Sequence, residues 1–384
     1  YIDVYLNGVR LKSGEDYNTG TANTIAGLSA LDANDEVNIV VYDTFTVADT
    51  VKASEGGAFG GDLSIAKDSG VLSFGADSDI TLTHTADTGL TLNGTFTSTG
   101  LASTTSGTSN FVAGVNAGNS IASGGNYNVT VGDEAGTALT TGDNNVAVGF
   151  EALSTEDAHG NNTAVGYRAL KVLDAGADGD NVAVGRDAGL SMTLGKQNIL
   201  VGGQCGDALT DADENVAMGH GTLSSDTLGS KTTAIGYNAL NQQNFGTATN
   251  TMNTAVGYYA GLSITNGQYN TFVGAEAGDG VDDGDYNVAV GYKALSANCG
   301  QLNVAVGADA LEVCTGSDNT AIGYRAGESI TSGGQNVFVG TYCGDGGDDS
   351  LYCVAVGRSA MGNANFGNGN TAVGWSSGFA ITGL

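Results

Sequence analysis

Apolar and polar positions alternate in this chain within a five-residue pattern, Asn-x-Ala-Val-Gly, which recurs about every 17 residues from Asn110 onward. In residues 145–149, NVAVG, the two valines fall on one face and the alanine on the other, as they do in a β-strand. The dozen residues between copies are mostly Gly, Ser, Thr, Asn and Asp, which favour turns. Each repeat therefore predicts one strand of about five residues followed by a turn-rich loop.

The spacing of the repeats predicts how they are arranged. Consecutive pattern glycines are 16 to 19 residues apart, with one interval of 21 before Gly257. A short, fixed period is typical of repeat proteins, in which each unit packs on its neighbours. We therefore expect residues 110–384 to form a parallel β-solenoid of about 16 coils, with successive strands about 4.8 Å apart.

Stacking in register turns each repeat position into a column of like residues. We expect the residue before the pattern glycine, such as Val148, Val165 and Val184, to be the core column. The alanine two positions before the glycine is small enough to lie against a second sheet or a partner chain. Asparagine stands four positions before the glycine in 14 of the 16 repeats, with Thr232 and Cys353 as the exceptions. An inward asparagine column can form hydrogen bonds from coil to coil, so we predict a structural role for Asn128, Asn145, Asn162, Asn181, Asn198 and Asn215.

A longer period of about 70 residues, or four coils, is superimposed on the first. Segments such as GRDAGLSMT, GYYAGLSIT and GYRAGESIT recur at this interval, and each is followed by a coil with an acidic loop. Leu200, Phe272 and Phe338 replace the usual alanine in the strands of those acidic coils. Duplication of a four-coil block is the simplest origin of this period.

Composition narrows the classes of partner. The formal net charge is −29, with only 12 lysines and arginines, which argues against nucleic acid or an anionic membrane as a partner. No apolar run reaches the roughly 18 residues that a membrane-spanning helix requires. The five cysteines lack a metal-type CxxC spacing, and most are expected to be buried free thiols. The first residue is Tyr1 and the last coil stops at Leu384, so we expect the sequence to be part of a longer product.

The N-terminal third differs from the repeats. YIDVYLNGVRL contains an alternating strand that runs into Asn7-Gly8, a strong signal for a two-residue hairpin turn, and DEVNIVVYDTFTV reads as further strands. We assign residues 1–50 to a small β-domain and residues 51–109 to a β-rich neck or shaft. A single copy of either piece buries little apolar surface, so trimerisation would help both.

The acidic loops provide the main candidate ligand set. Clustered carboxylates and backbone carbonyls suit Ca²⁺, although the loops lack both the EF-hand order and the nonapeptide calcium repeat. A solvated acidic edge explains the same residues without a ligand. The candidate calcium ligands are Asp207, Asp211, Asp213, Asp279, Asp283, Asp285, Asp345 and Asp348. No other cofactor is indicated.

Evidence for catalysis is weak. His84, His159 and His220 occupy unrelated positions, which supports neither a catalytic triad nor a metal–histidine cluster. Paired carboxylates could serve glycoside hydrolysis, but nothing in the sequence indicates a groove. We therefore predict that the protein is not an enzyme. Aromatic residues after the pattern glycine could stack on sugars, but their regular spacing favours packing on the next coil or on a partner chain. These residues are Phe150, Tyr167, Tyr237, Tyr258, Tyr292, Tyr324 and Trp375.

Two N-terminal motifs and the repeats resemble known families. VYLNGVRLKSGEDYNTG together with DEVNIVVYDTF resembles the attachment domains of tailed-phage fibres, especially those of marine cyanophages. GVLSFGADSDITLTHTADTGLTLNG is similar to a segment of marine-phage virion proteins. The NTAVGYNAL repeats resemble phage fibre proteins and the heads of trimeric autotransporter adhesins. The resemblance to adhesin heads implies a left-handed β-roll and a trimer, although the coils here are longer than those of the adhesins.

These resemblances lead to a functional expectation. They imply a homotrimeric structural fibre of the virion, most simply a tail fibre, that acts as a spacer for attachment to the host cell. Residues 1–50 would then dock on the tail or on other phage structural proteins, and the far end would reach a host receptor or glycan. Two alternatives stay open: a tailspike depolymerase that acts on host surface polysaccharide, and a bacterial trimeric surface adhesin.

Overall fold

The computed structural model describes residues 2–18, 25–26, 28, 31–32, 34–41, 105–362 and 366–379. The chain divides into two compact units, Tyr1–Thr95 and Phe96–Leu384. Most of the predicted neck, and with it His84, lies outside the described residues.

The described part of the first unit is a small antiparallel sheet in the order β2-β1-β3, formed by β1 (Ile2–Leu6), β2 (Val9–Arg10) and β3 (Val37–Val41). The predicted hairpin turn is confirmed, because Asn7 (φ 50°) and Gly8 (φ 81°) both adopt the left-handed conformation that a two-residue turn needs. The Asn7 side chain also joins the turn to the residues directly before β3: Nδ2 donates to Asp35 Oδ1 (2.7 Å), and Oδ1 accepts the Glu36 N–H (2.8 Å). The hydrogen bond from Asn7 Nδ2 holds the pKa of the Asp35 carboxyl below its usual value.

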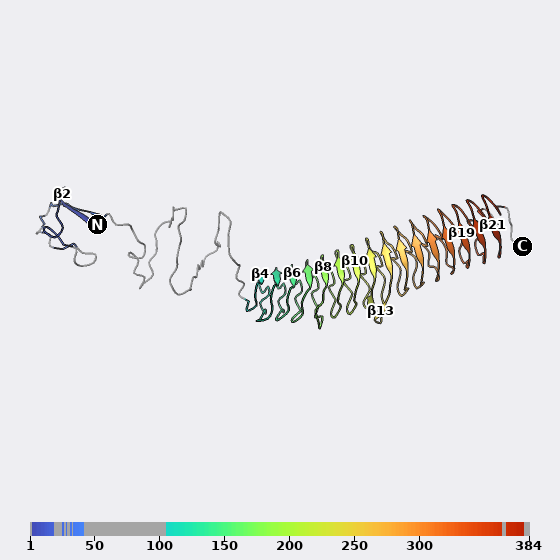
Figure 1. Cartoon of the computed structure of the whole chain (residues 1–384), viewed down its shortest axis with the longest axis horizontal. Coiled ribbons are helices and arrows are strands. Elements are labelled where there is room, and N and C mark those ends of the chain that lie inside the picture. Colours follow the sequence, from blue (N-terminus) through green and yellow to red (C-terminus); the bar gives the residue numbers. More distant parts are fainter. Residues whose placement is uncertain are drawn as a thin grey trace. The chain divides into compact units, whose positions relative to one another are not determined.

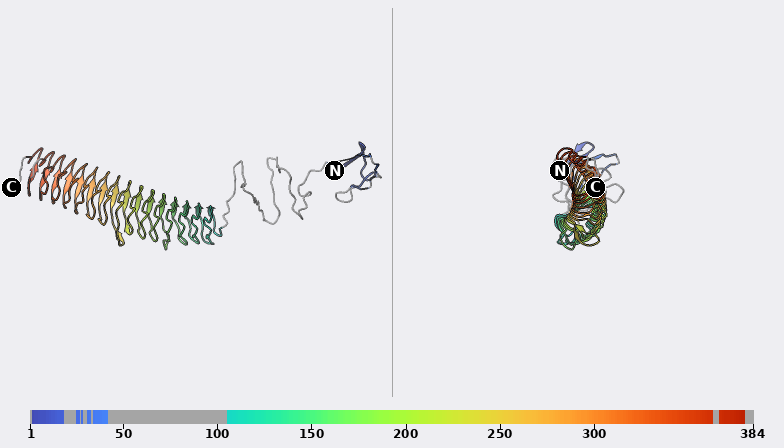
Figure 2. Two further views of the ribbon diagram at one scale, coloured as in Figure 1. Left: turned by 180° about the vertical axis from the view of Figure 1, so that it is seen from behind. Right: turned by 90° about the vertical axis from the view of Figure 1, so that its right-hand side faces the viewer.

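The described part of the second unit is an all-β solenoid, as predicted. One strand from each coil joins a 16-stranded parallel sheet, and the coils follow one another along a single axis (Figures 1 and 2). The strands in chain order are β4 (Phe111–Ala113), β5 (Val129–Val131), β6 (Val146–Val148), β7 (Thr163–Val165), β8 (Val182–Val184), β9 (Ile199–Val201), β10 (Val216–Met218), β12 (Thr233–Ile235), β14 (Thr254–Val256), β15 (Thr271–Val273), β16 (Val288–Val290), β17 (Val304–Val306), β18 (Thr320–Ile322), β19 (Val337–Val339), β20 (Val354–Val356) and β21 (Thr371–Val373). A separate two-stranded sheet, β11 (Gly229–Ser230) with β13 (Thr249–Asn250), lies beside the one long interval.

The pairing register confirms that like positions stack. Ala147 pairs with Ala164, and the valines on either side of Ala147 pair with the residues that flank Ala164. Each strand has three residues rather than the expected five. The backbone N–H of the asparagine before the strand bonds to the side chain of the preceding asparagine rather than to the sheet, as Asn215 does with Asn198. The glycine after the strand leaves the strand conformation, at a φ between 120° and 146°.

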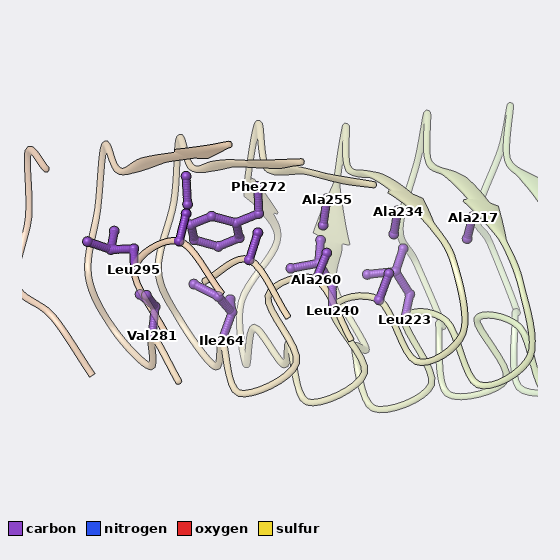
Figure 3. Packing of buried hydrophobic residues seen from close by; sticks show 14 of the residues in the cluster. Ala217, Leu223, Ala234, Leu240, Ala255, Ala260, Ile264, Phe272, Val281 and Leu295 are labelled. Atoms are coloured by element: carbon purple, nitrogen blue, oxygen red, sulfur yellow. The ribbon is translucent and has the colours of Figure 1, made fainter. Parts of the chain in front are cut away.

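The predicted core column was wrong. Ala147, at the centre of its strand, is fully buried, whereas Val148, Val165 and Val184 are only partly buried on the outer face. The interior is narrow. The part of each coil that follows the strand, here called the return side, fills it with buried side chains. Leu223 and Leu240, for example, point towards the strand alanines (Figure 3). There is then room for only a small strand-centre residue, so the larger valines take the outer face.

The four-coil period has a packing explanation. The fourth residue after the pattern glycine, here called the fourth position, is leucine, methionine or glycine. Where two successive coils carry glycine there, the strand-centre residue between them is larger than alanine: Thr130, Leu200, Phe272 or Phe338. A Cβ atom added to Gly261 or Gly278 would lie only 2.8 or 2.5 Å from the ring of Phe272. Leu200 and Phe338 fit between equivalent glycine pairs.

The asparagine column forms the predicted ladder, and all six named asparagines are fully buried. Asn198 is representative: its Oδ1 accepts the N–H of Asn215 in the next coil (3.0 Å), and its Nδ2 donates to the Ala212 carbonyl (2.7 Å). The ladder is altered at Thr232, which replaces an asparagine and whose hydroxyl forms a hydrogen bond of 2.7 Å with the Thr251 hydroxyl. A side-chain ladder therefore runs inside the sheet and fixes the position of one coil over the next.

Candidate functional site

The outer face of the 16-stranded sheet carries exposed apolar side chains along the described solenoid. The first and third residues of the strands point outward and are mostly Val, Ile, Thr or Met. Among those with more than a third of their surface exposed are Ile199, Met218, Val273, Ile322, Val337, Val356 and Val373. Because like residues stack, the third residues of the strands form one continuous apolar column, and the first residues form a second column in which threonine interrupts the Val and Ile side chains.

Aromatic side chains border this face on one side. The rings of Phe150 and Tyr167 stack with centroids 5.6 Å apart, and Tyr237 stacks on His220 (5.7 Å) and on Tyr258 (5.6 Å). The prediction that this column packs on the next coil is confirmed for these rings. Their faces cover one another, so they present ring edges to solvent. Trp375 is the most exposed large apolar residue of the column, at 76%.

A second aromatic column borders the other side, at the residue before the ladder asparagine. Tyr269 and Tyr286 stack at 4.8 Å with an interplanar angle of 6°. Tyr127 and Tyr352 occupy the same position elsewhere and are about 60% exposed. Tyrosines on both sides thus widen the apolar face and add hydroxyl groups at its borders.

The carboxylates of the acidic loops occupy equivalent places in three coils. Asp207, Asp279 and Asp345 are partly buried and each accepts a hydroxyl hydrogen bond, from Ser224 (2.7 Å), from Ser296 and from Ser329 (3.0 Å) respectively. Burial raises the pKa of the Asp207 and Asp279 carboxyls, and the serine hydrogen bonds partly oppose the rise.

The other candidate ligands accept hydrogen bonds from backbone N–H groups or are exposed to solvent. Asp213 and Asp285 each accept the backbone N–H of a residue in the preceding coil, at 2.8 and 2.7 Å. Asp211, Asp283 and Asp348 are exposed. Within the described residues, none of the eight candidate ligands belongs to a group of three or more carboxylate, histidine or cysteine ligands close enough to share an ion. Calcium binding at these loops remains a prediction.

One such group exists elsewhere in the described chain, and the sequence analysis missed it. Glu156, Asp157, His159 and Asp174 place one ligand atom each within 4.8 Å of all the others. His159 Nδ1 lies 3.0 Å from Glu156 Oε1 and 3.9 Å from Asp174 Oδ1. His159 therefore lies in a group of possible metal ligands, which the unrelated sequence positions of the three histidines did not indicate. His220 lies in the aromatic column, away from this group. The repeat alignment contains a usable signal, because Asp157 and Asp174 hold the same position in successive coils.

The cysteines carry no sign of reactivity. All five lie in the described part of the chain, and all are free and buried, as expected for most of them. Burial raises the thiol pKa to about 12 for Cys205 and Cys299 and to about 11 for Cys314 and Cys343. These thiols stay protonated at neutral pH and act as small apolar residues.

No protein-family model matches this chain, and a comparison with curated proteins found no match either. Across the described residues, no helix has the length and apolar character needed to cross a membrane.

Proposed function

We propose that the solenoid is the stiff shaft of a homotrimeric virion fibre, most simply a tail fibre, that holds a host-attachment region away from the particle. The observation that carries this proposal is the largely apolar outer face of the sheet, in which the third strand residue is apolar in every coil. Soluble monomers rarely expose contiguous apolar patches larger than a few hundred Å². A face of this kind along a parallel sheet is best explained if other copies of the chain cover it.

The size of the face suits such an interface. Sixteen strands at about 4.8 Å span about 70 Å, and three residues per strand add a width of about 10 Å. The resulting area of about 700 Å² is close to the roughly 800 Å² that each partner contributes to a stable interface. The bordering tyrosines increase it further. In a three-fold arrangement, this face and the bordering tyrosines together would be divided between two neighbours.

The mechanical role follows from the hydrogen bonding. Backbone bonds connect every coil to the next and the asparagine ladder reinforces most of these junctions, so the stack resists bending. A fibre with this construction contributes reach, and three chains contribute avidity at the receptor. The resemblance of the first residues to phage attachment domains supports docking of residues 1–50 on the virion. The net charge of −29 fits a surface appendage that avoids nucleic acid and anionic membranes.

Light scattering on the 384-residue chain tests the trimer. We expect a particle of three chains at micromolar concentration, and a monomer would overturn the interface. The double variant Val273→Lys/Ile322→Lys adds charge to the outer face and should dissociate the trimer while circular dichroism still reports a β-fold. Leu194→Lys changes an exposed apolar residue in a loop and should leave the trimer intact.

Immuno-electron microscopy tests the location. Antibodies raised against residues 105–379 should decorate an appendage of purified virions. Decoration of bacterial cells in the absence of phage would instead favour the surface-adhesin alternative. Release of oligosaccharide from host surface polysaccharide by the purified chain would favour the depolymerase.

A further inference from the structure

We propose that Glu156, Asp157, His159 and Asp174 bind one first-row divalent ion, of the class of Zn²⁺ or Mn²⁺, which links two successive coils of the solenoid. Glu156, Asp157 and His159 follow strand β6, and Asp174 follows strand β7. The site does not depend on the proposed fibre function.

The geometry is close to that of a bound ion. Two ligand atoms of the same tetrahedral zinc ion lie about 3.3 Å apart, since each is about 2.0–2.1 Å from the metal. The His159 Nδ1 to Glu156 Oε1 and His159 Nδ1 to Asp174 Oδ1 distances of 3.0 and 3.9 Å bracket this value. All four ligand atoms lie within 4.8 Å of one another, so small side-chain rotations would bring them to one ion.

The donor types indicate which ions fit. An imidazole nitrogen suits Zn²⁺ and other first-row transition ions, whereas Ca²⁺ takes six to eight oxygen ligands. One nitrogen and up to three carboxylate oxygens make a mixed set that Mn²⁺ also accepts. The imidazole thus distinguishes this group from the all-carboxylate acidic loops.

The repeat itself marks these residues as exceptions. Asp157 and Asp174 occupy the eighth position after the pattern glycine, where most other described coils have threonine or asparagine, such as Thr140 and Thr193. Other aspartates at this position, Asp282 and Asp348, each follow a coil with threonine, and those threonine hydroxyls bond to them. In the described coils, only the Asp157–Asp174 pair places carboxylates at this position in adjacent coils.

Glu156 is the second exception, because it is fully buried at the seventh position after the pattern glycine, where most coils have an apolar residue. Asp226 holds the same position in another coil, and its carboxylate is satisfied by Gln243 Nε2 (2.6 Å) and by the Gly229 and Phe245 N–H groups (3.1 and 3.2 Å). Glu156 accepts the backbone N–H groups of His159 and Ala175, both at 3.1 Å, and its remaining partner is the His159 ring.

Charge balance points the same way. Among the described residues, neither Lys nor Arg forms an ion pair with any of the three carboxylates, and the His159 ring contacts only Glu156 and Asp174 of the three. The nearby Lys171 pairs with Glu151 instead. Three carboxylates therefore have no Lys or Arg partner at this point, and a divalent ion would supply two positive charges there.

Calorimetric titration of the 384-residue chain with Zn²⁺ and Mn²⁺ tests the site, with Ca²⁺ as the comparison ion. We expect one transition-ion site per chain, and His159→Gln and Asp174→Asn should each weaken it by at least about tenfold. Both substitutions are at partly exposed side chains, so the fold should survive, which circular dichroism checks. His220→Gln and Asp282→Asn are the matched controls, one in the aromatic column and one at an isolated eighth-position carboxylate, and should leave the affinity unchanged.

Hydrogen exchange provides a second measurement. Added Zn²⁺ should slow exchange in β6 and β7 of the wild-type chain but not of His159→Gln. The proposal is overturned if neither Zn²⁺ nor Mn²⁺ binds at submillimolar concentration, or if the His159→Gln chain binds as well as the wild type. It is also overturned if the control variants lose affinity equally, which would indicate diffuse binding to surface carboxylates.

Discussion

The two faces of the 16-stranded sheet are built from opposite kinds of residue. The inner face carries alanine at the strand centre and asparagine before the strand, both fully buried. The outer face carries the larger β-branched residues, which are half-exposed. In an ordinary one-sided sheet the larger apolar residues cover the core. Here the return side of the coil fills the interior, so the inner face is limited by space and the outer face is free to use the residues that suit a strand best.

The two faces should differ in how far a substitution lowers the stability of the solenoid. The largest loss is expected at the glycine that ends each strand. A Cβ atom on Gly236 would lie 2.1 Å from the Gly257 carbonyl oxygen, at a φ of +137°. We expect Gly236→Ala to destabilise the solenoid by at least about 4 kcal/mol, because neither the backbone nor the neighbouring coil can move. Denaturant unfolding followed by circular dichroism measures this. An unfolding midpoint equal to that of the wild type would show that the coils can separate locally.

The inner asparagine ladder should be the next most sensitive feature. Asn198→Ala leaves the Asn215 N–H and the Ala212 carbonyl without partners, and two buried orphan groups cost about 3 kcal/mol together. Hydrogen exchange should localise the loss to strands β9 and β10. Asn266→Ala, at an exposed loop asparagine, should stay within about 0.5 kcal/mol of the wild type. Equal effects of the two substitutions would contradict a structural ladder.

Adjacent residues of β16 compare the two faces directly. Ala289 is fully buried and pairs with Phe272, so Ala289→Val should overpack the interior and cost about 2 kcal/mol. Val290 lies beside it on the outer face, and Val290→Thr should change the stability of the chain by less than about 0.5 kcal/mol. Thermal unfolding of both variants as dissociated chains, in which the proposed trimer does not cover the outer face, decides between them. A greater loss at Val290 would mean that the outer face is the true core.

One substitution on the inner face should be stabilising. Thr130 is a fully buried strand-centre residue whose hydroxyl has no hydrogen-bond partner. Thr130→Val removes this unsatisfied group at constant shape and should stabilise the solenoid by about 1 kcal/mol. Thr163→Val, at a half-exposed outer position, is the control and should have almost no effect. Destabilisation by Thr130→Val would imply that the hydroxyl is bonded in solution.

The repeat pattern predicted the parallel solenoid, the stacking register and the asparagine ladder because all three depend on sequence period alone. It did not predict which face of the strand is buried. Alternation separates Val148 from Ala147, but only the return side of the coil, with residues such as Leu153, determines which of them points inward. The group around His159 was missed for a similar reason: Asp174 is distant in sequence and comes close only when one coil lies on the next.

The paired glycines at the fourth position have a consequence for how the molecule can change its length. A large residue such as Phe272 needs a glycine in its own coil and in the preceding one, so adding or deleting a single coil at that place would separate a large side chain from its space. Adding a whole block of four coils keeps every such set intact. The reach of this protein can therefore evolve in increments of about 19 Å, four strand spacings at a time, without any new core having to arise.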